Sequence, residues 1–376
     1  MDFGLSEGQE MLKEAARDFL STNCPKSLVR EMEEDKKGYS PELWHKMAGL
    51  GWMGLIFPEE HGGGGGNFLD LAVLLEEMGR ALLPGTFFST VVLSGLLLLE
   101  AASEKQKREL FPKIAQGQAI LTIALHEPET ELAPAFLTTK AVPQGNDYII
   151  SGTKLFVPDA HVANHIICVA RTTDANASEG LTLFLVDGNS SGLQCNLLET
   201  MAGDKQCEVV FDGVRVPREN IIGETDKGWA YIEKVMPKVA VAKSMEMMGG
   251  AQQVVEMAAE YARTRVQFER PIGSFQAIQH HCANMLIDVN SSRFLAYRTA
   301  WMISEGIPCL KECYMTRAWV NDAYRRVVRL GVQVHGGIGI IKEYDMELYF
   351  RRGKMAEFAF GSADFWREKL AAEIGL

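Results

Sequence analysis

The sequence lacks a long apolar segment, an excess of basic residues and a secretory leader. Its longest apolar run, residues 91–99, is about half of the roughly 20 residues that a membrane-spanning helix needs. The formal net charge of −11 disfavours nucleic acid and anionic membranes as partners, because both are polyanions. The first residues contain no basic segment followed by an uninterrupted apolar run. We therefore expect a cytoplasmic protein that binds neither nucleic acid nor a membrane.

Cysteine usage argues against disulfides and against a metal site. The seven cysteines are scattered along the chain, and an odd number without a leader indicates reduced thiols. Cys309 and Cys313 have the i,i+4 spacing of one helix face, but no matching pair of His or Cys residues stands nearby. Packing is the expected role of both thiols, and we predict no metal site.

The hydrophobic pattern changes twice along the chain and predicts an α+β fold with three parts. Residues 1–118 read as an all-helical part that begins with a capping box of Ser6 and Gln9. Residues 119–226 contain β-rich runs separated by Gly, Asn, Asp and Pro, which predict a β domain. Residues 227–376 return to the helical period. A content of 47% hydrophobic residues is enough for one large core or for two to three smaller ones.

Individual elements follow from the same periodicity. The strand runs are ILTIAL, YIISGTKLFV, HIICVA, LTLFLV and CEVVFDGVRV. Shorter helices are expected over 41–50, 68–81 and 105–117, and long helices over 229–265, 275–304 and 309–334. Pro237 predicts a kink or a helix start nearby.

Two blocks in the last part of the chain carry a family resemblance. The first is 261–276, YARTRVQFERPIGSFQ, and the second is 333–339, QVHGGIG, which Glu343 and Tyr344 follow. In this order, after a β-rich region, the blocks resemble the flavin-dependent acyl-CoA dehydrogenase family. The resemblance covers nearly the whole chain. It implies an N-terminal helical domain, a middle β-barrel-like domain and a C-terminal long-helix domain built as a four-helix bundle.

The resemblance implies FAD as the cofactor and assigns contacts to it. Arg265 and Phe268 would contact the flavin pyrophosphate and the ring region, and Gln276 would reach the FAD of a neighbouring subunit. A guanidinium can pair with two phosphate oxygens at once, and glycines let backbone amides approach a pyrophosphate closely. The second block would hold the adenine-side phosphates through Gln333, Gly336 and Gly337.

The β domain matches the family less closely. Residues 124–128, with Leu125 and His126, stand where the family has a flavin-contacting Thr-Glu-Pro strand, and residues 152–160 stand where it has Trp-Ile-Thr-Asn. The positions that bond or cover the isoalloxazine in the family are taken here by His126, Leu132, Phe156 and Pro158. An aromatic face for the flavin survives, whereas several hydrogen-bond donors do not. His126 is either a flavin contact or an ordinary histidine, and the sequence leaves both open.

The position that the resemblance assigns to the proton-abstracting glutamate holds Phe360, which we expect beside the substrate. In the family a carboxylate removes the α-proton of an acyl thioester, while a backbone amide and a flavin hydroxyl bind the thioester carbonyl and stabilise the developing enolate. Ser362 and Asp364 of the same segment fall at flavin-contacting places.

Other known positions for the base offer no clear replacement, so the catalytic residue stays unknown. The alternative position on the first long helix aligns with Val239. Glu233 lies on a different face of that helix, and Glu246 lies on nearly the same face but about 10 Å further along it. An ordinary ion pair of Glu246 with Lys243 is the competing interpretation. A third family position, around residues 84–95, contains no acid.

Three functions remain open. The first is an FAD-dependent acyl-CoA dehydrogenase for a bulky, aromatic or cyclic acyl group, with an electron-transfer flavoprotein as electron acceptor. The second is a base-less subunit that completes the FAD site of a homologous, active subunit through Gln276. The third is a flavin-free protein that binds CoA thioesters. We expect a homo-tetramer or a hetero-oligomer with a homologous subunit.

Overall fold

The computed structural model describes residues 4–128, 134–173 and 179–376, which form two compact units. One unit contains Met1–Arg30, Asn67–Leu83 and Ala240–Leu376, and the other contains Glu31–Gly66 and Pro84–Val239. Helices, then a sheet, then long helices follow one another along the chain, so the predicted α+β fold is confirmed. Leu132, one of the positions compared with the family, lies outside the described residues.

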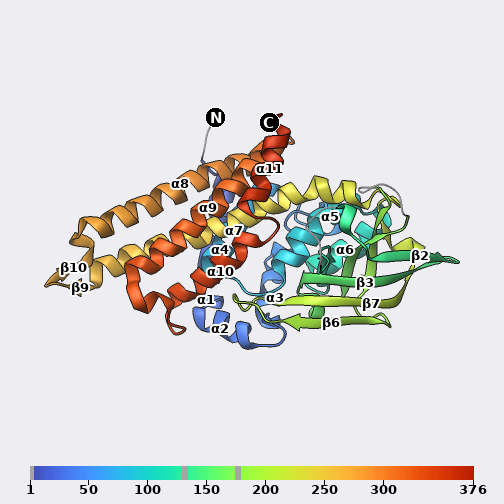
Figure 1. Cartoon of the computed structure of the whole chain (residues 1–376), viewed down its shortest axis with the longest axis horizontal. Helices are drawn as coiled ribbons and strands as arrows, with labels where there is room; N and C mark the ends of the chain where they lie inside the picture. The colour runs from blue at the N-terminus through green and yellow to red at the C-terminus, as the bar shows by residue number, and fades with distance from the viewer. Residues whose placement is uncertain (1–3, 129–133, 174–178) are drawn as a thin grey trace. The chain divides into compact units, whose positions relative to one another are not determined.

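The first unit is helical (Figure 1). Its helices are α1 Glu7–Asn23, α4 Phe68–Ala81, α8 Gln276–Ser304, α9 Leu310–His335, α10 Asp345–Phe358 and α11 Ala363–Glu373, together with most of α7 Gly228–Thr264. α9 packs against α8, α10 and α11, and α4 packs against α1 and α8. Within the described ranges, no helix is long and apolar enough to cross a membrane.

A buried carboxylate joins three of these helices. Glu76 on α4 accepts hydrogen bonds from Lys13 Nζ at 2.9 Å, from Arg293 Nη2 at 3.1 Å and from the hydroxyl of Tyr297. Two cations and a hydroxyl compensate the desolvation of this charge, which would otherwise destabilise the fold strongly. α1, α4 and α8 are thereby fixed against one another.

The predicted helix boundaries are close to those observed. The capping box of Ser6 and Gln9 is present at the start of α1. Pro237 lies inside α7, nine residues after the helix begins, so it does not mark a helix start.

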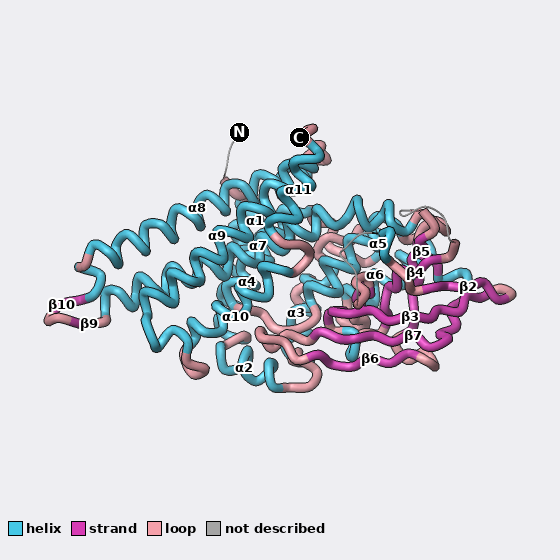
Figure 2. Tube along the Cα trace, viewed as in Figure 1, coloured by secondary structure: helices cyan, strands magenta, loops and turns pink. Residues whose placement is uncertain are grey.

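The second unit contains the sheet. Its strands are β1 Leu121–Ala124, β2 Lys140–Gln144, β3 Asp147–Pro158, β4 His165–Arg171, β5 Leu181–Asp187, β6 Leu193–Leu198, β7 Gln206–Pro217 and β8 Ile221–Ile222. In the part of the chain that the structure describes, their order is β6-β7-β3-β2-β4-β5-β8, with β1 parallel to β4. Figure 2 shows β6, β7 and β3 side by side. The sheet is mixed, and β6 and β8 end this path.

Short helices accompany the sheet in this unit. They are α2 Lys26–Glu34, which continues from the first unit, α3 Pro41–Gly49, the π-helix η3 Phe88–Ser94, α5 Gly95–Ala101 and α6 Glu104–Ala115. Thr90 of η3 donates its hydroxyl to the carbonyl of Leu121 at 3.2 Å and accepts the amide of Leu121 at 3.1 Å. The region that contains no acid, around 84–95, is therefore tied to the first strand of the sheet.

Candidate active site

The hairpin that follows α7 presents two of the predicted FAD contacts. β9 Val266–Gln267 pairs with β10 Arg270–Pro271, and Phe268 and Glu269 form the turn with φ values of 52° and 66°. Positive φ at both central residues is what a two-residue type I′ turn requires. Phe268 is 85% exposed. The guanidinium of Arg265 is also exposed and has no hydrogen-bonding partner among the described residues.

The end of α9 presents the second block. Gly336 has φ 67° and ψ −145°, a conformation essentially restricted to glycine. A Cβ added at Gly336 or Gly337 would meet nothing within 4 Å, so the backbone here is open to a ligand. The side chains of Gln333 and Gln276 are exposed, and within the described ranges neither amide has a hydrogen-bonding partner. An unpaired guanidinium, two unpaired amides and an open glycine backbone fit a cofactor that carries a pyrophosphate, such as FAD.

In the second unit, a buried ion pair holds the strand that matches the flavin-contacting strand. Leu125, His126 and Glu127 directly follow β1. Lys154 Nζ on β3 lies 2.7 Å from Glu127 Oε1 and 3.3 Å from the carbonyl oxygen of Leu125. The amide and hydroxyl of Thr138 both donate to Glu127 Oε2 at 2.7 Å. Burial alone would raise the pKa of Glu127, but Lys154 and Thr138 outweigh it and lower the pKa to about 2.

His126 is half-buried beside this ion pair. Burial and, secondarily, the charge of Lys154 lower the pKa of His126, so its imidazole is neutral at pH 7. Its backbone carbonyl accepts the amide of Leu155 at 2.9 Å. A neutral imidazole has one donor and one acceptor nitrogen. It could therefore replace a hydroxyl partner of a flavin, and this contact stays a prediction.

Phe156 lies at a β-bulge of β3. The register between β3 and β7 shifts between Lys154 and Val157, and Phe156 has φ 53°, an uncommon value for an aromatic residue. Its side chain is 61% exposed. Bulges commonly re-aim side chains next to functional sites. Here the bulge lies shortly before Pro158 ends the strand and leaves an aromatic ring exposed. Its contact with a flavin stays a prediction.

The segment between α10 and α11 contains the position assigned to the base. Phe360 has φ 58°, is half-buried, and accepts a hydrogen bond at its carbonyl from Trp366 Nε1 at 3.1 Å. A phenyl ring accepts no proton at neutral pH. Ser362 is the N-cap of α11, where its hydroxyl accepts the amide of Phe365 at 3.2 Å. Asp364 is exposed and forms an ion pair with a side chain on its own helix.

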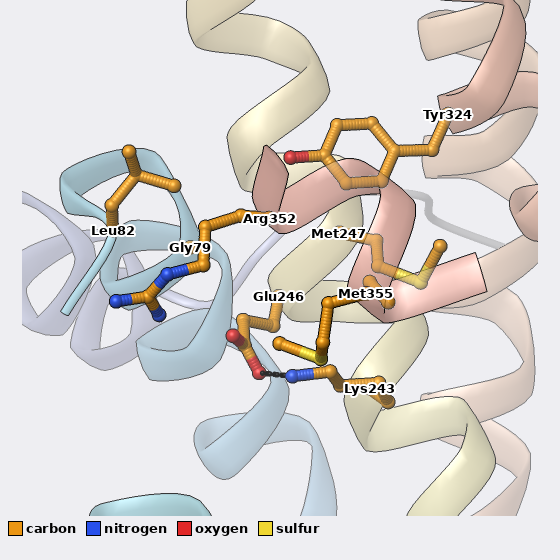
Figure 3. A pocket seen from close by; sticks show the side chains of 9 residues that line it. Gly79, Leu82, Lys243, Glu246, Met247, Tyr324, Arg352 and Met355 are labelled. Carbon is orange, nitrogen blue, oxygen red and sulfur yellow. Dashed lines mark hydrogen bonds and ion pairs between the residues drawn. The ribbon is translucent and has the colours of Figure 1, made fainter. Parts of the chain in front are cut away.

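The aligned position on α7 and the two acids near it differ in their surroundings. Val239 is fully buried and Glu233 is exposed. Glu246 Oε2 lies 2.8 Å from Lys243 Nζ, as the ion-pair interpretation expects. Figure 3 shows this pair in a pocket whose lining also includes Tyr324, Arg352 and Met355.

Sequence reasoning missed several polar residues that shape the site. Lys154 and Glu127 join β3 to the segment that follows β1, and Arg317 and Asn321 contact the segment that carries Phe360. The available signals were a lysine inside an apolar strand run and two polar residues four apart on a helix. Neither signal identifies a partner, because each partner lies far along the chain.

Comparisons with known proteins describe all three parts of the chain. The family "Acyl-CoA dehydrogenase" matches through its N-terminal domain at residues 6–118, its middle domain at 122–214 and its C-terminal domain at 226–375. The cyclohexane-1-carbonyl-CoA dehydrogenase of Geobacter metallireducens is 31% identical over 86% of this chain and 87% of the relative.

Two further matches also cover most of both chains. Subunit CarC of the caffeyl-CoA reductase-Etf complex of Acetobacterium woodii is 29% identical over 92% of each chain. A structure titled as the ChsE4-ChsE5 complex from Mycobacterium tuberculosis has a TM-score of 0.90 at 27% identity, and the match covers 100% of this chain and 99% of that one.

The three domain matches follow the order of helices, sheet and helices, and the C-terminal match spans both blocks that carry the resemblance. FAD is the cofactor of this family, and the exposed guanidinium, amides and aromatic rings of the chain fit it. The chain belongs to the acyl-CoA dehydrogenase family of FAD-dependent oxidoreductases.

Proposed function

We propose that the chain binds FAD and a CoA thioester and takes part in α,β-dehydrogenation of a bulky, aromatic or cyclic acyl group. The observation that carries the proposal is the FAD-compatible surface of the first unit, where Arg265 is unpaired beside the exposed Phe268 and the backbone at Gly336 is open. The acyl class is supported by relatives named for cyclohexane-1-carbonyl-CoA and caffeyl-CoA.

The chemistry divides between the cofactor and the chain. When bound, FAD would supply the acceptor for the hydride that leaves the β-carbon of the thioester. The chain orients the thioester, and the backbone amide of residue 360 binds its carbonyl so that the α-proton becomes acidic. A carboxylate is still needed to accept that proton.

A specific observation favours a second candidate, the base-less subunit of a heteromeric dehydrogenase. Phe360 cannot accept a proton, and Lys243 occupies one oxygen of Glu246. The similar structure from Mycobacterium tuberculosis is that of a complex whose name gives two components, ChsE4 and ChsE5. In this case the chain would complete the FAD site of an active partner through Gln276.

Colour and bleaching separate the candidates. A purified protein with a flavin absorption band excludes the flavin-free, thioester-binding function. Anaerobic bleaching of that band by an acyl-CoA excludes the base-less subunit, because reduction requires loss of the α-proton. A panel that includes aromatic and cyclic thioesters then identifies the acyl class.

Arg265→Ala is expected to weaken FAD retention by about tenfold or more. The cofactor pyrophosphate would lose charge-assisted hydrogen bonds worth roughly 1.5–3 kcal/mol each. Flavin content after gel filtration is the measurement. Arg263→Ala is the matched control, because Arg263 is a neighbouring exposed arginine that pairs with Glu260. Unchanged flavin content in Arg265→Ala would contradict this placement of the cofactor.

The protein is expected to be an oligomer, most simply a tetramer. Ile287, Phe294 and Trp301 recur every seven residues on α8 and all are exposed in the single chain. Such a stripe is normally buried against another helix, and Gln276 at the start of the same helix is expected to serve a neighbour's FAD. Light scattering at micromolar concentration measures the mass. A flavin-bound monomer would show that both arguments fail.

We also propose an electron-transfer flavoprotein as the redox partner, which the name of the CarC complex supports. The domain division 1–118, 119–226 and 227–376 is proposed as well, since the three family matches cover similar residues.

A further inference from the structure

The segment that carries Phe360 is held by a fully buried arginine on α9. Arg317 is 0% exposed. Its Nη2 donates to the carbonyl of Ala356 at 2.8 Å and to the carbonyl of Ala359 at 2.5 Å. One guanidinium therefore binds the last turn of α10 and the residue directly before Phe360.

A second side chain on the same face of α9 extends this arrangement. Asn321 lies four residues after Arg317, which places both on one side of the helix. Its Nδ2 donates at 3.3 Å to the carbonyls of both Glu357 and Gly361. Together with the bond from Trp366 to the carbonyl of Phe360, side chains bind the backbone on both sides of residue 360.

The contacts answer two needs of the backbone. The last carbonyls of a helix have no partner within the helix, and the negative end of the helix dipole favours a cation. Arg317 supplies a hydrogen-bond donor and a positive charge at the end of α10. The φ of 58° at Phe360 is unfavourable for a residue with a Cβ, and such a conformation persists only where its surroundings determine it.

Glu246 acts on the buried guanidinium electrostatically. Burial lowers the pKa of Arg317, and the negative charge of Glu246 opposes that effect. Glu246 also pairs with Lys243. The negative charge of Glu246 thus partly offsets the cost of burying the Arg317 guanidinium.

We infer that Arg317 and Asn321 are positioning residues for thioester binding. They fix the backbone of residues 359–361 so that the amide of residue 360 faces the thioester carbonyl, and they do so whatever side chain residue 360 carries. The inference rests on the proposed function. It identifies the residues that keep the carbonyl-binding half of the site in place, whichever group accepts the proton.

The test compares two ligands that differ only at the carbonyl. Benzoyl-CoA has a thioester carbonyl and no α-hydrogen, so it binds without reacting, and S-benzyl-CoA is the thioether that lacks the carbonyl. Affinities are measured on the flavin-bound protein by titration calorimetry. Arg317→Met is expected to weaken benzoyl-CoA binding about tenfold, to leave S-benzyl-CoA binding within about twofold, and to leave flavin content unchanged. Arg317→Lys is expected to recover part of the loss.

Two further variants keep the test decisive. Asn321→Leu is nearly isosteric and removes the donor to Gly361. It is expected to weaken benzoyl-CoA binding more than S-benzyl-CoA binding, and it replaces Arg317→Met in the test if that variant does not fold. Arg325→Met is the matched control, since Arg325 lies on α9 but pairs with the side chain of Glu357. Equal loss for both ligands, or the same loss in Arg325→Met, would overturn the inference. A wild-type protein that binds neither ligand would instead count against the proposed function.

Discussion

Phe360→Glu is expected to create or raise α,β-dehydrogenation of a small acyl-CoA by about 10²- to 10⁴-fold if the chain is a base-less subunit. The conformation of residue 360 is held by backbone contacts from α9 and α11, so a new side chain would project as the phenyl ring does now. The amide half of the enolate site is then present, and only the proton acceptor is supplied. The measurement is acyl-CoA-dependent flavin reduction in wild type and variant, side by side.

The same variant gives the opposite result if the chain takes its base from another residue. A second carboxylate beside a working one would raise the pKa of one of the pair and disturb both, so activity would fall or stay flat. Phe360→Gln is the control for polarity and size without basicity, and it should not raise activity. Robust reduction by the wild-type protein with several thioesters would refute the base-less interpretation outright.

The long helices could be predicted well because local signals define them. The predicted helix over 68–81 agrees with α4 Phe68–Ala81, and 275–304 differs by one residue from α8. Apolar residues at the helical period and capping residues at the ends suffice for such boundaries. β2 and β6 were missed, since β2 is exposed apart from Ala141 and contains Pro143, and neither strand is a continuous apolar run.

The candidate site could be predicted only where its residues are close in sequence. Arg265 and Phe268 stand in one hairpin, and Gln333 and Gly336 at one helix end, so short blocks carry them. Lys154 and Glu127 are 27 residues apart in the sequence, and Arg317 and Ala356 are 39 apart. The sequence next to each cation does not indicate which residue it contacts. The bulge that exposes Phe156 depends on the register of β3 with β7, which is likewise a long-range property.

Lys154→Met is expected to destabilise the second unit by about 3–5 kcal/mol near pH 7, because it removes the cation that pairs with the buried Glu127 carboxylate. For a unit of this size the apparent unfolding midpoint should fall by roughly 6 °C or more. Thermal unfolding followed by circular dichroism measures the effect. Lys140→Met is the matched control, because Lys140 is exposed on the neighbouring strand β2 and has no partner among the described residues. It should change the midpoint little.

The pH dependence of this variant identifies the buried charge as the cause. In the wild-type protein the pKa of Glu127 is lowered from 4.5 to about 2, so the ion pair contributes fully above pH 4.5 and its contribution is lost as the pH falls toward 2. Without Lys154, burial is opposed chiefly by hydrogen bonds such as those from Thr138, so the pKa of Glu127 is higher than in the wild-type protein and the variant takes up a proton at Glu127 first. The difference in stability between wild type and Lys154→Met should therefore be largest near neutral pH and should shrink as the pH falls.

Adding Glu127→Gln to Lys154→Met should recover part of the stability at pH 7, since a neutral amide replaces the carboxylate that has lost its cation. A deficit that is independent of pH and unchanged in the double variant would mean that Lys154 stabilises the strand through packing of its methylene chain and not through its charge.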